Sequence, residues 1–366
     1  MLFTPETIGT LALPNRFVRS ATAEGFADEA GKPLPALAAM YGALAAGGVG
    51  LIITGHMYVH PSGKAHVGMT GIYTDDLLPA LTELSSAAHL AGGRIVVQIN
   101  HGGMQCSQEA TTERIAPSAI DAPFLQAPAR EMTRHEIDTA IDAYAQAARR
   151  TMEAGFEGVQ IHAAHGFLIS QFLSPFVNGR TDEWGGDLNG RMRFLREVCR
   201  AVRSQVGADY PVLIKLGMFD AVDGGLTLED GLQIVAALQE MGIDGVEISG
   251  GIGGKKNINS RPGIKRREQE AYFRPIAQDA RKVTDLPILL VGGLRSRDVM
   301  EDVLSTGDAD FISLCRPLIC EPDLPNRMRQ GELERATCIS GNRCWPDSPG
   351  EGIACKRPIE GTGRAQ

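Results

Sequence analysis

One local pattern recurs along the chain: a helical segment ends at glycine, and a short, continuously apolar run follows within a few residues. Glycine just after a helix adopts the left-handed conformation without steric cost, so it commonly ends helices. Apolar runs that do not alternate with polar residues are typical of parallel strands covered on both faces. Eight such runs are predicted to be strands: Phe17–Ala21, Val49–Thr54, Ile95–Ile99, Val159–His162, Val212–Leu216, Val246–Ser249, Ile288–Val291 and Phe311–Leu314.

Helix signals lie between the predicted strands. An apolar stripe at 3.6-residue spacing runs from Ile137 to Ala148, and Thr133 with Glu136 forms a capping box just ahead of it. Eight strand–helix units predict an α/β fold, a (β/α)8 TIM barrel. A doubly wound open sheet is the alternative, but the G-x-G-x-x-G motif that usually follows its first strand is absent from this sequence.

The predicted units divide the chain unequally. We expect residues 1–330 to form the barrel and residues 331–366 to form a C-terminal extension that packs on it or is partly irregular. The longest connection, from Gly102 to Ala129 after the third strand, is predicted to be a loop. Long connections in compact barrels usually serve as lids or docking surfaces.

Composition narrows the class of protein. The 366 residues carry a formal charge of −8, which argues against a nucleic-acid-binding protein because such proteins present a basic surface. The uncharged stretch from Pro33 to Gly63 is long enough to span a bilayer, but its glycines favour a helix, a glycine break and a strand instead. Seven cysteines and no export signal between Met1 and Phe17 predict a soluble cytoplasmic protein with free thiols.

Active sites of TIM barrels lie where the strands run out into the following loops. Lys215 lies in an apolar strand, where a cation must be paired, lose its proton or face an anionic ligand. Gly292 and Gly293 with Arg316 are typical of a phosphate site, which barrels commonly form after the seventh and eighth strands. Other polar residues at strand ends are Gln98, His162, His165 and Cys315. No metal site is predicted, because the spacing supplies no third ligand beside the two histidines.

Several longer motifs resemble the Old Yellow Enzyme family of FMN-dependent oxidoreductases, and in particular the barrel domain of the 2,4-dienoyl-CoA reductases. The resemblance covers about residues 1–330. Its most specific part is the run from Gln171 to Pro175 that continues through Asn178 to Gly186. The other matching segments are Leu13 to Ala21, Gln98 with His101 to Gly103, and His162 to Gly166.

The resemblance implies a role for each matching position. Lys215 matches the basic residue near flavin N1, where a cation favours the reduced flavin electrostatically. His162 and His165 match the pair that holds an acceptor oxygen while hydride passes from flavin N5, so these three residues are the candidate catalytic groups. The implied FMN-binding residues are Ala21, Thr22, Ala23, Gly55, Gln98, His162, Lys215, Gly292, Gly293, Cys315 and Arg316.

Two departures from the family pattern bear on function. The usual proton donor is a tyrosine, but this chain has Phe167 there, so Tyr58, Tyr73 or water would supply the proton, or the oxidant needs none. The second departure concerns an iron–sulfur segment of four cysteines, because Gly341 stands where its second ligand would be. Three cysteines remain in that segment, Cys338, Cys344 and Cys355, and a cluster normally takes four thiolates.

Together these features predict an FMN-dependent NAD(P)H oxidoreductase that reduces activated C=C bonds of a small molecule, with NADH or NADPH as electron donor and no nucleic-acid or membrane partner. A homo-oligomer is compatible with the sequence. One alternative is a Schiff-base lyase or aldolase with Lys215 as nucleophile. Another is a flavin-binding protein whose reductase activity is weak because of Phe167. The basic segment from Lys255 to Arg267 fits either a grip on a nucleotide or CoA phosphate or a solvated loop.

Overall fold

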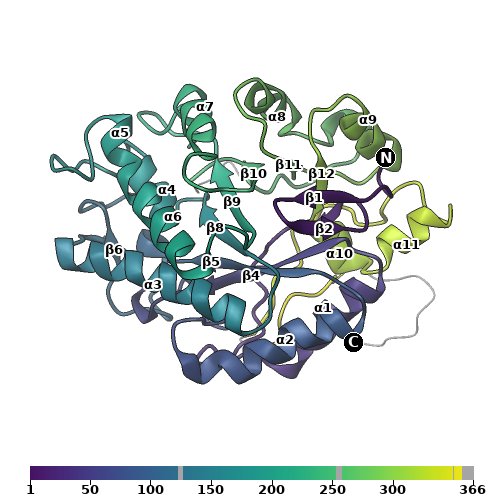
Figure 1. Ribbon diagram of the computed structural model, residues 1–366, viewed down its shortest axis with the longest axis horizontal. Coiled ribbons are helices and arrows are strands. Elements are labelled where there is room, and N and C mark those ends of the chain that lie inside the picture. The colour runs from purple at the N-terminus through teal and green to yellow at the C-terminus, as the bar shows by residue number, and fades with distance from the viewer. Residues whose placement is uncertain (123–126, 253–257, 349, 357–366) are drawn as a thin grey trace.

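The computed structural model describes residues 1–122, 127–252, 258–348 and 350–356, and a closed barrel of eight parallel strands forms its centre (Figure 1). Neighbours in the barrel follow the order of the sequence, and the last strand pairs with the first. The predicted TIM barrel is confirmed. The strands are β3 (Phe17–Arg19), β4 (Leu51–Tyr58), β5 (Ile95–Asn100), β8 (Val159–Ala163), β9 (Val212–Gly217), β10 (Gly245–Ser249), β11 (Ile288–Leu290) and β12 (Phe311–Leu314).

Helices surround the barrel and connect its strands (Figure 1). The predicted capping box is present at the start of α3, where the Thr133 hydroxyl accepts from the Glu136 N–H and the Glu136 carboxylate accepts from the Thr133 N–H. The helices are α1 (Pro35–Ala46), α2 (Leu78–Leu90), α3 (Arg134–Glu153), α4 (Leu168–Leu173), α5 (Leu188–Arg191), α6 (Arg193–Val206), α7 (Leu228–Ala237), α8 (Arg274–Arg281), α9 (Arg297–Ser305), α10 (Arg316–Cys320) and α11 (Leu324–Arg329).

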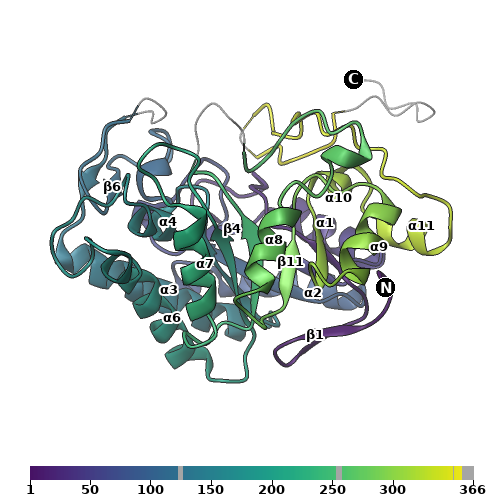
Figure 2. The same cartoon turned by 90° about the horizontal axis from the view of Figure 1, so that it is seen from above.

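A hairpin that the sequence analysis did not predict closes the amino-terminal end of the barrel. Strands β1 (Glu6–Ile8) and β2 (Leu11–Leu13) pair antiparallel. Ile8, Leu11 and Leu13 pack against apolar side chains from the barrel strands. The hairpin lies at one end of the molecule and the C-terminal segment at the other, as Figure 2 shows. Because the hairpin covers the amino-terminal end of the barrel, the carboxyl ends of the strands remain available to form a site.

Connections at the carboxyl ends of the strands are longer and less regular. The segment after β5 is mostly loop, as predicted, but it also contains β6 (Ile115–Ala116), which pairs with β7 (Arg130–Glu131). After α11, the described part of the chain has no further helix or strand. The uncharged stretch from Pro33 to Gly63 forms α1 and β4, as the glycines indicated. Within the described residues, we find no helix long and apolar enough to cross a bilayer.

Candidate active site

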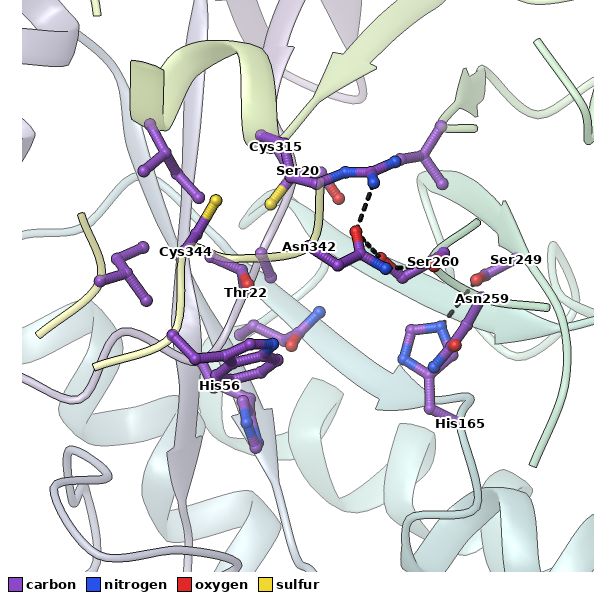
Figure 3. A pocket seen from close by; sticks show the side chains of 18 of the residues that line it. Ser20, Thr22, His56, His165, Ser249, Asn259, Ser260, Cys315, Asn342 and Cys344 are labelled. Atoms are coloured by element: carbon purple, nitrogen blue, oxygen red, sulfur yellow. Dashed lines mark hydrogen bonds between the residues drawn. The ribbon is translucent and has the colours of Figure 1, made fainter. Parts of the chain in front are cut away.

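A cavity of about 690 Å³ opens at the carboxyl ends of the barrel strands (Figure 3). Its size lies within the range of small-molecule and cofactor sites. Gly55 and Gly292 adjoin lining residues in sequence but do not themselves line the cavity. The predicted site residues that do line it are Ala21, Thr22, Ala23, Gln98, His162, His165, Lys215, Gly293, Cys315 and Arg316.

The Lys215 ammonium group lies at the base of this cavity in an ion pair. Its Nζ is 3.3 Å from Oε1 of Glu247 on the neighbouring strand β10, and it donates to the Ser20 hydroxyl over 2.8 Å. Only 5% of the Lys215 side chain and 0% of the Glu247 side chain are exposed. The two residues are partners in the barrel register, so both side chains point to the barrel interior.

A chain of hydrogen bonds continues from Glu247 to Gln98. The Gln160 side-chain nitrogen donates to Glu247 Oε2 over 3.1 Å, and the Gln98 nitrogen donates to the Gln160 oxygen over 2.6 Å. Gln98 lines the cavity, whereas Gln160 and Glu247 lie beneath it and are fully buried. Sequence analysis missed both buried residues. The signal for Glu247 was available, because it is a charged residue inside an apolar strand, as Lys215 is.

The two predicted histidines lie together at the end of β8. Their ring centres are 5.1 Å apart, and the His162 ring is 4.8 Å from that of Phe167. His162 Nδ1 accepts from the Ala164 N–H, so Nε2 carries the proton of the neutral ring and can donate to a ligand. His165 Nε2 is 2.7 Å from the Ser249 hydroxyl (Figure 3), and its backbone has a positive φ of 62°. A non-glycine residue in this conformation is strained, which is common at functional sites.

Two further histidines that sequence analysis missed also line the cavity. His56 on β4 packs with its ring centre 6.0 Å from that of His162, and His66 lies 5.3 Å from His56. Burial lowers the pKa of His162 and of His56 well below the ordinary value, and neighbouring histidines and Lys215 lower both further. Burial, with Lys215, lowers the pKa of His165 to about 3. These imidazoles are therefore neutral at pH 7 and act as hydrogen-bonding groups rather than cations.

The opposite end of the cavity is built by β11, β12 and α10. Gly293 has a φ of 75°, and a Cβ there would lie 3.0 Å from the Tyr272 ring, so this position needs glycine. The Ser313 hydroxyl is buried and has no hydrogen-bond partner within the described residues. The Arg316 guanidinium donates to the Arg261 carbonyl over 3.0 Å and also to the side-chain oxygen of Asn342.

The C-terminal segment contributes a wall that sequence analysis did not predict. Its lining residues are Ser340, Asn342, Cys344, Trp345, Pro346 and Ile353. The Cys355 and Cys320 sulfur atoms are 3.4 Å apart. No set of three or more histidine, cysteine or acidic side chains is arranged to hold a metal ion in the parts of the chain that are described. In the basic segment, Arg261 stacks on Tyr272 and Arg267 pairs with Asp298, while Lys255 and Lys256 lie outside the described residues.

The position of the usual proton donor is occupied by an apolar ring. Phe167 lines the cavity between His56 and His162. Tyr58 and Tyr73 stack on each other, and both hydroxyls donate to the Ala30 carbonyl. Neither tyrosine is among the lining residues, so the structure gives neither of them access to a bound acceptor.

The residues of this cavity fit an FMN. Lys215 offers a cation that would stabilise the negative charge of a reduced isoalloxazine, and the fixed orientation of Gln98 leaves its amide oxygen free to accept from a ring N–H. At the other end, Gly293 permits close backbone approach, and the unpartnered Ser313 hydroxyl and Arg316 are groups that suit a phosphate.

Comparisons with known proteins agree with this geometry. The profile of the NADH:flavin oxidoreductase / NADH oxidase family matches residues 1–334. The chain is 36% identical to the NADH oxidase of Thermoanaerobacter brockii over 93% of its own length and 52% of that protein. It is 35% identical to the NADPH dehydrogenase of Bacillus subtilis over 88% of its length and 92% of that protein. The solved old yellow enzyme homologue of Zymomonas mobilis is 28% identical, with a TM-score of 0.79 over 91% of this chain and 93% of that one.

The chain therefore belongs to the NADH:flavin oxidoreductase / NADH oxidase family. At the level of the family, this confirms the resemblance to the Old Yellow Enzymes and the predicted class of enzyme, a flavin oxidoreductase. The chain spans about half the length of the NADH oxidase it matches.

Proposed function

We propose that this protein is an FMN-dependent NAD(P)H oxidoreductase that reduces activated C=C bonds of small molecules such as enones. One observation carries the proposal: Lys215, Gln98, His162 and His165 come from three segments of the chain and converge on one cavity at the carboxyl ends of the strands. Their combination supplies a cation, a hydrogen-bond acceptor and two neutral imidazoles, which are the groups that a flavin and an acceptor oxygen need.

Each of these residues has a distinct task in the proposed reaction. When bound, FMN would accept a hydride from NADH or NADPH and pass it to an electron-poor acceptor. His162 would donate from Nε2 to the acceptor oxygen and so polarise its conjugated C=C bond. Ser249 fixes the ring of His165 beside it. Lys215 would stabilise the negative charge of the reduced cofactor, and Phe167 would exclude water from the site.

Phe167 also favours a second class of acceptor. Oxidants such as quinones or dioxygen accept electrons from a reduced flavin, and the protein does not have to donate a proton to a carbon atom of the oxidant. The apolar ring beside His162 suits such an acceptor as well as an enone. A related protein named NADH oxidase is compatible with this class. Seven free cysteines support a reducing, cytoplasmic location for either reaction.

The test is a pair of half-reactions on the chain reconstituted with FMN under anaerobic conditions. Addition of NADH or NADPH should bleach the visible flavin absorption, and cyclohexenone or a quinone should restore it. His162→Ala should slow the return by cyclohexenone about 10-fold or more, while the control His135→Ala, an exposed residue of α3, should not. A protein that binds no FMN, or whose flavin neither nucleotide reduces, would refute the proposed function.

A further inference from the structure

Glu247 lies directly beneath the proposed flavin site but does not line it. Its two carboxylate oxygens have different partners. Oε1 accepts from the Ser20 hydroxyl over 2.6 Å and faces Lys215 Nζ at 3.3 Å, whereas Oε2 accepts from Gln160 over 3.1 Å. One carboxylate thus pairs with Lys215 and is linked through Gln160 to Gln98, and both Lys215 and Gln98 line the cavity.

The charge of Glu247 determines the orientation of Gln98. A carboxylate can only accept hydrogen bonds, so Gln160 must turn its NH₂ group toward Glu247 and its oxygen toward Gln98. Gln98 must then donate its own NH₂ to Gln160, which leaves its oxygen for the cavity. Glu247 thus determines, through Gln160, that Gln98 presents an oxygen and not an NH₂ group to the cavity.

The same carboxylate partly neutralises Lys215. Both side chains are buried, and at a separation of 3.3 Å the negative charge offsets much of the field that the ammonium group projects into the cavity. A reduced flavin carries more negative charge than an oxidised one, so an offset cation stabilises the reduced form less than a free cation would.

We propose that Glu247 is a positioning residue that sets both the reduction potential of the bound flavin, by offsetting the charge of Lys215, and the affinity for FMN, through Gln160 and Gln98. The inference rests on the proposed function. It makes the pair Lys215–Glu247, rather than Lys215 alone, the electrostatic unit beneath the flavin.

The isosteric variant Glu247→Gln tests both effects, the change in FMN affinity and the change in reduction potential. Lys215 has only donors, so the new amide must turn its oxygen toward Lys215 and its NH₂ toward Gln160. Gln160 and then Gln98 must invert, and Gln98 presents NH₂ instead of oxygen to the cavity. We expect the Kd for oxidised FMN to rise about 10-fold. With the offsetting charge gone, reduced FMN should gain at least 10-fold in affinity relative to oxidised FMN, an upward shift of about 30 mV for a two-electron couple.

The experiment measures the Kd for FMN and the midpoint potential of the reconstituted full chain by spectroelectrochemistry. In a Lys215→Met background the stranded carboxylate remains beneath the site, so Glu247→Gln should raise the potential there too. In a Gln98→Ala background Glu247→Gln should no longer weaken FMN binding. Gln160→Leu, which cuts only the link to Gln98, should weaken FMN binding and leave the potential unchanged. The control Asp220→Asn alters a buried carboxylate that does not line the cavity and should change neither value.

The outcomes separate this inference from the proposed function. A wild-type chain that fails to bind FMN refutes the proposed function itself. A wild-type chain that binds FMN, with unchanged potential and Kd in Glu247→Gln, overturns the role of Glu247 and leaves the proposed function standing. If Glu247→Gln does not fold, Gln160→Leu still tests the proposed effect on FMN affinity. Unchanged FMN binding in Gln160→Leu would contradict the proposal.

Discussion

The most demanding prediction concerns the substitution Lys215→Met. It removes one partner of a buried ion pair and leaves the Glu247 carboxylate, which is fully buried, with only the Ser20 and Gln160 hydrogen bonds. Two unit charges 3.3 Å apart interact by about 5 kcal/mol at an effective dielectric constant of about 20. Removing one partner of a buried pair typically costs about 3–5 kcal/mol. The two figures agree, so we expect a loss of stability in this range.

The loss should appear as a lower melting temperature of the FMN-free chain. An unfolding entropy of about 2.1 cal/mol/K per residue, applied to this chain, converts the range into a decrease of about 4–7 °C. FMN is left out because a bound ligand adds its own stabilisation. Differential scanning calorimetry of wild type and variant at pH 7 measures the difference.

A double variant tests the cause of the loss. Lys215→Met with Glu247→Gln removes the stranded charge and should recover most of the stability. A melting temperature within 1 °C of wild type, about the effect of 1 kcal/mol in a chain of this size, would refute the reasoning. So would a double variant as unstable as the single one.

Three further predictions address other parts of the site. His165→Gly should relieve the backbone strain at φ 62° and be about 0.5–1 kcal/mol more stable than His165→Ala. Both variants should bind a phenol more weakly and retain FMN. Equal melting temperatures of the two variants would show that the strain is negligible. Phe167→Tyr should speed the reoxidation of the reduced enzyme by cyclohexenone, up to about 10²-fold. Tyr58→Phe should have no effect, because the Tyr58 hydroxyl is bound to the Ala30 carbonyl. A Tyr58→Phe variant that loses turnover would contradict this. Burial raises the pKa of Asp220 to about 6, so the folded state holds the proton more tightly than the unfolded chain. Stability should therefore fall by about 2 kcal/mol as the pH rises from 4 to 7. Urea unfolding should show this fall in wild type and not in Asp220→Asn.

The barrel could be predicted from the sequence because its strands are buried on both faces. A strand such as β9 is then apolar at every position but one, and glycine marks where the preceding helix ends. The hairpin of β1 and β2 could not be predicted in this way, since each strand has only three residues. Its pairing depends on the barrel end that it covers.

The site was predictable where single residues break a local pattern and not where distant residues meet. Lys215 was conspicuous within an apolar strand, but its partner Glu247 lies on the next strand and becomes recognisable only from the barrel register. His56 and His66 reach the cavity through the course of β4 and the loop after it. Trp345 and its neighbours come from an irregular segment with no periodicity, so the sequence carried no signal for their position.

The central claim is that the cavity at the carboxyl ends of the strands binds FMN through Lys215 and Gln98. Isothermal titration of the FMN-free chain with FMN tests it most directly, with Lys215→Met, Gln98→Ala and His60→Ala as variants. His60 lines a separate cavity of about 430 Å³ and serves as the matched control. We predict one FMN per chain, weaker binding in the first two variants and unchanged binding in the third. Binding that is insensitive to Lys215 and Gln98 but lost in His60→Ala would contradict the account.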